Sequence, residues 1–249
     1  MHFKKFEVLD ITENSKIKGT GLIAVEDTIT LFVNGTRIAS IMATPDMLHE
    51  LAVGYLICEG VVDDPRDIMD VHLGENLDVR ITLKTSDQVE VWHELRSSGC
   101  IGVGWEKNEN IHVTSDAKFT ADCIRDSLIH LDSEAHEKTR GTHSASLIDE
   151  DGNLIVKAVD IGRHNAVDKV VGSAVLDGVD LSRVFLISTG RQSAGMVLKA
   201  ARAGIPLVVS KKAPLSSGIE TAKKAGVTLV CFASKDKLSV YSHPERIES

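Results

Sequence analysis

Aromatic side chains are scarce in this sequence, at 4% of its 249 residues. Proteins that bind single-stranded nucleic acid commonly stack bases on aromatic side chains, so the shortage argues against such a platform. The formal net charge of −8 points the same way, because non-specific binding to nucleic acid depends on basic surfaces. We therefore expect no nucleic-acid partner.

Long apolar runs are also missing. No run approaches the ~20 residues that a membrane-spanning helix needs, and the opening residues MHFKKFEVLD do not form a signal peptide. The composition, 43% apolar and 26% charged, is typical of a soluble globular protein. These features predict a cytoplasmic protein without a membrane partner.

Paired cysteines are absent as well. The four cysteines lie at least 23 positions apart, which excludes structural-zinc spacing, and no metal site is predicted. Cys58 lies in an apolar helical pattern and Cys231 in an apolar strand, so both are expected in the core. Cys123 falls in a polar segment and receives no assignment. Cys100 lies in SSGCIGVGW, a glycine-rich loop, where a thiol is either incidental or presented to a partner.

The charge divides unevenly along the chain. Residues 1–112 carry a net charge of −9 and residues 113–249 a net charge of +1, and the segment 199–237 reaches +6. We place a domain boundary between the first two ranges. Lys223 and Lys224 fit a solvated helix face, whereas Lys211 and Lys212 follow a strand and fit that interpretation poorly.

The first half has the pattern of a small α+β unit. Asn34-Gly35 between two apolar segments is a strong hairpin signal, and Thr44 followed by Pro45 predicts the start of a helix that stops at Gly60. The predicted elements are strands 29–33, 36–43, 77–83 and 89–92 and a helix over 44–60.

The second half alternates strands and helices, which predicts βαβ units and a parallel sheet. Asp168 and Lys169 are expected as surface charges on a helix that also has an apolar face. The predicted elements are a hairpin over 145–160, helices over 164–178, 193–204 and 216–226, and strands 184–188, 205–210 and 227–233.

Four loops follow the carboxyl ends of these strands, where parallel sheets bind ligands. Each loop carries Arg or Lys, and helix N-termini beside such side chains favour phosphate groups. We therefore expect Arg163, Arg191, Lys211 and Lys212 to converge on a pyrophosphate-bearing ligand; a basic rim without a ligand is the alternative. Neither a GxGxxG nor a Walker motif is present. The loops are 160–164, 188–193, 210–216 and 234–237.

Two histidines stand beside these loops, at His143 in RGTHSAS and His164 in DIGRHNAVD. Histidines at such positions more often cap backbone groups than carry out chemistry. The residues alone leave their role open.

Several long motifs resemble the formate dehydrogenase accessory sulfurtransferase family, FdhD/NarQ, across essentially the whole chain. They are ELAVGYLICEG (50–60), SSGC (97–100), GTHSA (141–145), DIGRHNAVDKVVG (160–172), STGRQSAGMVLKAARAGIP (188–206), TLVCFA (228–233) and VYSHPERI (240–247).

The resemblance implies a C-terminal cytidine-deaminase-like α/β/α sandwich over residues 113–249, beside a smaller N-terminal α+β domain over 1–112 that carries the cysteine loop. It implies a sulfurtransferase that passes persulfide sulfur from a cysteine desulfurase to a bis-molybdopterin guanine dinucleotide cofactor of molybdenum or tungsten, as formate dehydrogenase requires. It also implies a homodimer.

Site residues follow from the same resemblance. Cys100 corresponds to the persulfide cysteine on the family's glycine loop. The segment after the last core strand corresponds to the cofactor-binding segment, and the basic loop residues and His164 join it. The implied cofactor-binding residues are Arg163, His164, Arg191, Lys211, Lys212, Phe232, Ala233, Ser234, Lys235, Asp236 and Lys237.

The chain departs from the family at its cysteine loop. Family members commonly have two cysteines spaced Cys-x-x-Cys, whereas here Val103 occupies the second position and Ile101 replaces a glycine. A thiol relay within the loop is excluded, and a one-cysteine mechanism remains. A cofactor chaperone that moves no sulfur is the main alternative. A zinc-dependent nucleoside deaminase is disfavoured, because His143 has no Glu two residues later and no Pro-Cys-x-x-Cys follows.

Overall fold

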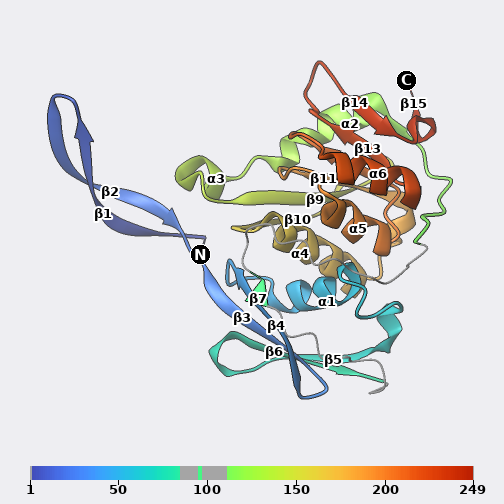
Figure 1. The fold of residues 1–249 in the computed structure, drawn as a ribbon, viewed down its shortest axis with the longest axis horizontal. Helices are drawn as coiled ribbons and strands as arrows, with labels where there is room; N and C mark the ends of the chain where they lie inside the picture. Colours follow the sequence, from blue (N-terminus) through green and yellow to red (C-terminus); the bar gives the residue numbers. More distant parts are fainter. Residues whose placement is uncertain (1, 85–94, 97–110, 249) are drawn as a thin grey trace.

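The computed structural model describes residues 2–84, 95–96 and 111–248. Its β-structure consists of two main sheets, a projecting hairpin and a short pair formed by β8 (Phe119–Thr120) and β15 (Ile247–Glu248), and the helices pack between and around the main sheets (Figure 1). Strand 89–92 and Cys100 of the sequence predictions lie outside the described residues. None of the described helices is long and apolar enough to span a membrane.

The larger sheet has six strands in the order β10-β9-β11-β12-β13-β14. Its central strands β11 (Val184–Ser188), β12 (Leu207–Ser210) and β13 (Thr228–Cys231) are parallel. The parallel strands and the hairpin over 145–160 are confirmed, since β9 (His143–Asp149) is antiparallel to β10 (Leu154–Asp160). The sheet as a whole is mixed, because β9 is also antiparallel to β11 and β14 (Ser239–Ser242) is antiparallel to β13, which the sequence did not predict. The short connections β9–β10 and β13–β14 leave no room for the crossover that parallel pairing needs.

Helices cover both faces of this sheet, which confirms the predicted α/β/α class. Residues from α4 (Arg163–Leu176), α5 (Ala194–Arg202) and α6 (Ser216–Ala225) form one core with the first face. On the second face, α2 (Ala121–Ser127), the 3-10 helix Leu128–Leu131 and β8 (Phe119–Thr120) form another. There Phe119 packs edge-on against Phe185, with ring centroids 5.1 Å apart.

The smaller sheet has the order β5-β6-β3-β4-β7. The predicted Asn34-Gly35 hairpin is confirmed, since it joins β3 (Asp27–Val33) to β4 (Thr36–Ala43) and both turn residues have positive φ, 47° and 82°. Strand β6 (Asp78–Leu83) pairs with β5 (Ile68–Leu73). The last strand, β7 (Leu95–Arg96), runs parallel to β4.

The predicted helix start at Thr44 is wrong. Helix α1 spans Leu48–Cys58, and Met47 precedes it in a left-handed conformation. Thr44 is buried and used elsewhere: its backbone N–H donates to Asp160 at 3.0 Å and its carbonyl accepts from Lys169 at 2.9 Å. The tertiary contacts of Thr44 thus replace the capping role that its residue type favours.

Helix α1 belongs to two cores at once. Leu51 and Leu56 pack on the smaller sheet, whereas Val53 and Ile57 join the core beneath α4 and α5. Helices α1 and α4 cross at two glycines, Gly54 and Gly172. A Cβ at Gly54 would lie 1.8 Å from the carbonyl oxygen of Asp168, and one at Gly172 would lie 1.9 Å from that of Glu50.

Charged side chains are buried near this crossing. Asp168 (1% exposed) and Lys169 (0%) are not the surface charges that the helical pattern predicts, and Lys199 (2%) is equally buried. Lys199 Nζ lies 2.7 Å from Asp168 Oδ1 and 2.8 Å from Glu59 Oε1. Helix α1 covers the face of α4 that would otherwise meet water, so these charges pair with each other instead.

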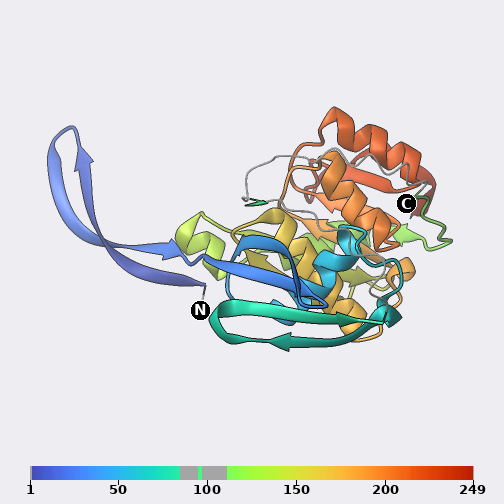
Figure 2. The same ribbon diagram turned by 60° about the horizontal axis from the view of Figure 1, so that its bottom comes forward.

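Residues 3–24 form a separate two-stranded hairpin of β1 (Phe3–Thr12) and β2 (Ser15–Ala24), which we call the arm. It projects away from the rest of the protein in two views (Figures 1 and 2). Its base contacts α3 (Glu134–Thr139), where Lys138 lies 5.0 Å from the ring of Phe3.

Candidate functional site: a basic edge of the larger sheet

The carboxyl ends of β10, β11, β12 and β13 lie on one edge of the larger sheet. Strand β10 is antiparallel to β9, which is antiparallel to β11, so β10 runs in the same direction as the three parallel strands. The four loops singled out by the sequence therefore emerge at one edge, which we call the basic edge. Three of them lead into α4, α5 and α6.

The helices that begin at the basic edge, like α1, lack a side-chain cap from the residue that precedes them. Gly162, Ser193 and Leu215 precede α4, α5 and α6, and none of them caps its helix with a side-chain hydrogen bond. By contrast, α2 and α3 elsewhere are capped by Thr120 and Ser133. The first-turn N–H groups of a helix have no intrahelical partners. Three helices thus direct their partially positive ends toward the same edge, and the carboxylate of Asp160 lies at the start of α4.

Arg163 joins two of the loops. Its side chain lies against Gly190, where an added Cβ would come within 2.8 Å of Arg163 Cδ. Any side chain at position 190 would displace the arginine. The same region includes His143, whose Nδ1 lies 3.2 Å from Thr189 Oγ1. Burial lowers the pKa of His143, and the positive charges of Arg163 and Lys212 lower it further. Both effects favour the neutral imidazole, and the negative charge of Asp160 opposes them.

Asp160 fixes the start of α4, and with it the position of Arg163. It is fully buried and accepts hydrogen bonds from the N–H of Gly162 at 2.7 Å and from Asn165 Nδ2 at 2.9 Å. It also pairs with Lys169 at 2.8 Å. The contact of Asp160 with Thr44 ties this part of the basic edge to the end of β4.

The loop after β13 lies beside the loop after β12. Phe232 N–H donates to the carbonyl of Lys212 at 3.1 Å, and Ala233 N–H donates to that of Ser210 at 3.0 Å. Phe232 has a φ of 51° and is 49% exposed. A left-handed backbone conformation is sterically unfavourable for an aromatic residue. Its ring faces solvent, where it could stack on a planar base.

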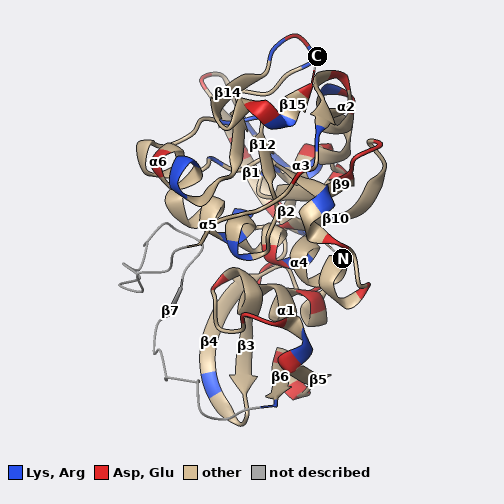
Figure 3. Ribbon diagram, turned by 90° about the vertical axis from the view of Figure 1, so that its right-hand side faces the viewer, with Lys and Arg blue, Asp and Glu red and all other residues tan. Residues whose placement is uncertain are grey.

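One predicted residue, Lys211, pairs with an acidic residue outside the four loops. Lys211 points to Asp132, with Nζ 3.1 Å from Oδ1, and Arg191 is exposed. Ser234 and Lys237 close a turn on themselves, through the N–H of Ser234 donating to the carbonyl of Lys237 at 2.9 Å. Lys235 and Asp236 are exposed within that turn. Basic segments also lie away from the edge, as on α6, which carries the exposed Lys223 and Lys224 (Figure 3).

His164 lies near the start of α5, with Cε1 3.6 Å from the position of a Cβ on Gly195. It is half-buried. The pairing of His143 with Thr189 was not predicted, because the two residues are 46 positions apart. His143 lies in the motif GTHSA and Thr189 in the motif STGRQS, and these two motifs were the only sequence signal for the contact.

The described thiols are unsuited to carrying sulfur. Cys58 and Cys231 are buried, which confirms the sequence prediction, and burial raises the pKa of each thiol. Cys123 is half-buried and its pKa is also raised by burial. Its Sγ lies 3.9 Å from the carbonyl of Glu150.

The fold and this edge define a mixed α/β protein with basic side chains and helix N-termini at its strand ends. The model of the FdhD/NarQ family matches residues 24–248. The chain belongs to this family. The fold is similar to a crystal structure described as a formate dehydrogenase accessory protein from Desulfotalea psychrophila, with a TM-score of 0.84, 25% identity and full coverage of both chains.

Curated relatives with similarity over most of their length are named sulfur carrier protein FdhD. The chain is 36% identical to the Methanothermobacter thermautotrophicus protein, over 88% of each chain. It is 34% identical to the Wolinella succinogenes protein, over 91% of this chain and 82% of the relative. It is 32% identical to the Sulfolobus acidocaldarius protein over the full length of both.

Proposed function

We propose that this protein is a sulfurtransferase that carries persulfide sulfur on Cys100 to a guanine-dinucleotide molybdenum or tungsten cofactor bound as cargo at the basic edge. The cysteine desulfurase is the sulfur donor and formate dehydrogenase is the client. The thiolate of Cys100 attacks the terminal sulfur of the donor's persulfide, and the donor's cysteine leaves as a thiolate.

The observation that carries the cargo site is the set of three helix N-termini at one edge, beside Arg163 and Lys212. Phosphate oxygens accept hydrogen bonds from such N–H groups and pair with guanidinium and ammonium groups. A dinucleotide supplies both the pyrophosphate for these groups and a base that can stack on Phe232.

Buried polar atoms beside the basic edge fit a polar ligand. Gln192 Oε1 and Ser144 Oγ have no hydrogen-bond partner among the described residues. Leaving such an atom unpaired costs about 1–3 kcal/mol. The donor set at the edge, with N–H groups, guanidinium, ammonium and hydroxyl, suits the phosphates and sugars of a nucleotide.

The path of the chain supports a thiol near this edge. Strand β7 runs parallel to β4, with Arg96 opposite Ile41, and so heads toward the end of β4. That end is followed by Thr44, which contacts Asp160. Cys100 follows Arg96 by four residues, and four residues span at most about 14 Å. The direction of β7 supports the proposal that the thiol of Cys100 serves this edge.

The proposal includes a cytoplasmic location, where cysteines remain reduced, and a homodimer. A chaperone that binds the cofactor without moving sulfur remains the second candidate. The absence of a second loop cysteine at Val103 favours it.

Mass spectrometry of the intact thiols separates the two candidates. After incubation with a cysteine desulfurase and cysteine, the peptide that contains Cys100 should gain the mass of one sulfur atom. Cys100→Ser should lose this gain and the activation of formate dehydrogenase while folding normally. The buried Cys58 and Cys231 provide internal controls that should stay unmodified. Normal client activation by Cys100→Ser would exclude sulfur transfer and leave the chaperone.

A further inference from the structure

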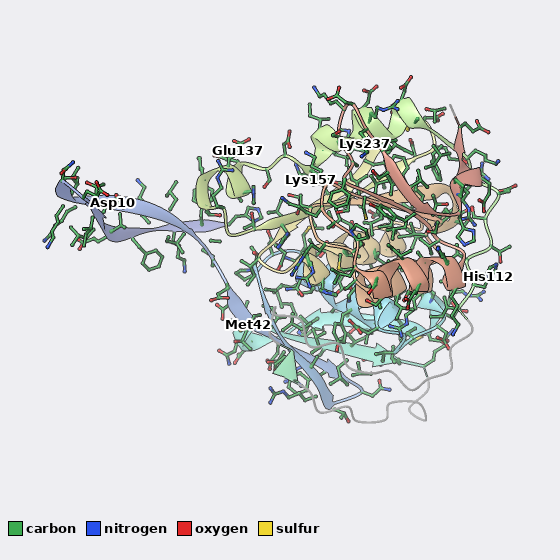
Figure 4. The ribbon with its side chains drawn as sticks, turned by 45° about the horizontal axis from the view of Figure 1, so that its top comes forward. Asp10, Met42, His112, Glu137, Lys157 and Lys237 are labelled. Atoms are coloured by element: carbon green, nitrogen blue, oxygen red, sulfur yellow. The ribbon has the colours of Figure 1, made fainter. Side chains whose placement is uncertain are left out.

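The arm exposes large apolar side chains along most of its length. Phe6 is 55% exposed, Ile17 60% and Ile23 51%, and Val8 is 38% exposed. Figures 1 and 2 show the arm clear of both sheets, and Figure 4 places Asp10 toward its outer end, away from Glu137 at its base. Isolated two-stranded hairpins are marginally stable in water. The arm therefore needs a partner.

The strand register divides the arm into two unlike faces. Residues directly opposite each other in an antiparallel pair of strands share a face. The pairs Phe6–Gly21 and Val8–Gly19 lie on one face of the arm. The pairs Glu7–Thr20 and Leu9–Lys18, which alternate with them, lie on the other face. One face, which we call the apolar arm face, has a charge at each end and no charge between. Its residues are Lys4, Phe6, Val8 and Asp10 from β1 and Ile17, Gly19, Gly21 and Ile23 from β2.

The opposite face also exposes apolar side chains, Leu9 (48%) and Ile11 (64%), and it differs from the apolar arm face in its charges. It intersperses Lys5, Glu7, Lys16 and Lys18 with its apolar residues. The difference between the faces predicts that contact with a partner is made by the apolar arm face.

The apolar arm face is complementary to itself. Lys4 lies at the end of this face nearest the protein body, and Asp10 lies on the same strand toward the outer end. The residues Phe6 and Val8 stand between them on this face. A two-fold rotation about an axis across the strands places Lys4 opposite the partner's Asp10, and Ile23 opposite the partner's Ile17. Phe6 then meets the partner's Val8, and the two glycines leave room for the ring.

We infer that the apolar arm face docks on the same face of a second copy, so that two antiparallel arms form the contact of a homodimer. Such an isologous contact is closed by its two-fold axis and stops at two copies. This inference rests on the homodimer of the proposed function and is independent of its sulfur chemistry. Loss of persulfide on Cys100 would leave it intact.

Charge reversal and charge exchange test the contact in the full chain. Each interface contains two Lys4–Asp10 pairs, so Lys4→Asp or Asp10→Lys replaces two attractions by two repulsions. Each single variant should raise the dimer dissociation constant about tenfold or more. The double variant Lys4→Asp/Asp10→Lys restores opposite charges and should return the constant close to that of the wild type. Sedimentation velocity measures the mass, expected at twice 27.0 kDa for the dimer.

Matched variants on the other face complete the test. Lys5→Asp makes the same charge change one residue away and should leave the dimer unchanged. Val8→Asp should give monomers, whereas Leu9→Asp should not. A monomeric wild type at micromolar concentration would overturn the inference. So would a double variant that dissociates like the singles, or equal effects of Lys4→Asp and Lys5→Asp. Far-ultraviolet circular dichroism verifies that each variant is folded.

Discussion

At the scale of single residues, the buried charges between α1, α4 and α5 are the least expected feature. Lys199 contacts two carboxylates, Asp168 and Glu59, so the group carries one negative charge more than its cation balances. Burial raises the pKa of Asp168 to about 6. The negative charge of Glu59 also raises this pKa, whereas the positive charge of Lys199 lowers it. The carboxylates also raise the pKa of Lys199 despite its burial, which keeps the ammonium charged.

The raised pKa of Asp168 predicts a specific pH dependence of stability. The folded state holds a proton on Asp168 up to about pH 6, whereas the unfolded chain releases it near pH 3.9. The contribution of Asp168 to the free energy of unfolding is therefore largest below pH 4 and falls as the pH rises to about 6. Relative to Asp168→Asn, the wild-type free energy of unfolding should fall by on the order of 2–3 kcal/mol between pH 4 and pH 7.

Urea unfolding at a series of pH values measures this difference. Asp177→Asn, an exposed position at the end of the same helix, is the matched control. A flat difference between wild type and Asp168→Asn would show that the carboxyl stays ionised in the fold.

At the scale of elements, the crossing of α1 and α4 joins the two sheets. Gly172→Ala would place a methyl group 1.9 Å from the carbonyl oxygen of Glu50, which belongs to backbone that cannot rotate away. The helices must separate, and we expect a loss of about 3 kcal/mol of unfolding free energy. Ser173→Ala, the next position on α4, should cost much less. A loss at Gly172 no larger than at Ser173 would contradict the close packing.

At the scale of the whole molecule, the proposed function divides between the two halves. The thiol belongs to the acidic first half and the cargo site to the second half. Cys100→Ser should therefore bind guanosine diphosphate normally but lose persulfide loading. The double variant Arg163→Ala/Lys212→Ala should load persulfide normally but bind the nucleotide at least tenfold more weakly, because two charge-assisted contacts are lost.

Both variants should fail to activate formate dehydrogenase. Calorimetric titration with guanosine diphosphate and mass spectrometry of Cys100 measure the two activities separately. Lys223→Ala, which removes an exposed charge on α6, is the control for a general charge effect. Loss of nucleotide binding in Cys100→Ser would show that the thiol segment is part of the cargo site.

The sequence alone determined most of the elements of the second half. Alternating apolar strands and amphipathic helices with glycine stops are local signals, and Gly178, Gly204 and Gly226 indeed follow α4, α5 and α6 with positive φ. The family followed from long motifs, and the meeting of four loops at one edge followed from strand direction. The helix, strand and turn signals and the motifs all consist of residues that are close together in the chain, so they can be read from the sequence.

Only the tertiary structure decided which helix faces are buried. Helix α1 covers α4, so Asp168 and Lys199 became an interior pair, and Thr44 serves Asp160 and Lys169 instead of a helix cap. Strand β9 entered the sheet antiparallel between β10 and β11, and Lys211 turned to Asp132. Each outcome depends on residues tens of positions apart, and local propensity carries no information about which distant surface will exclude water from a given side chain.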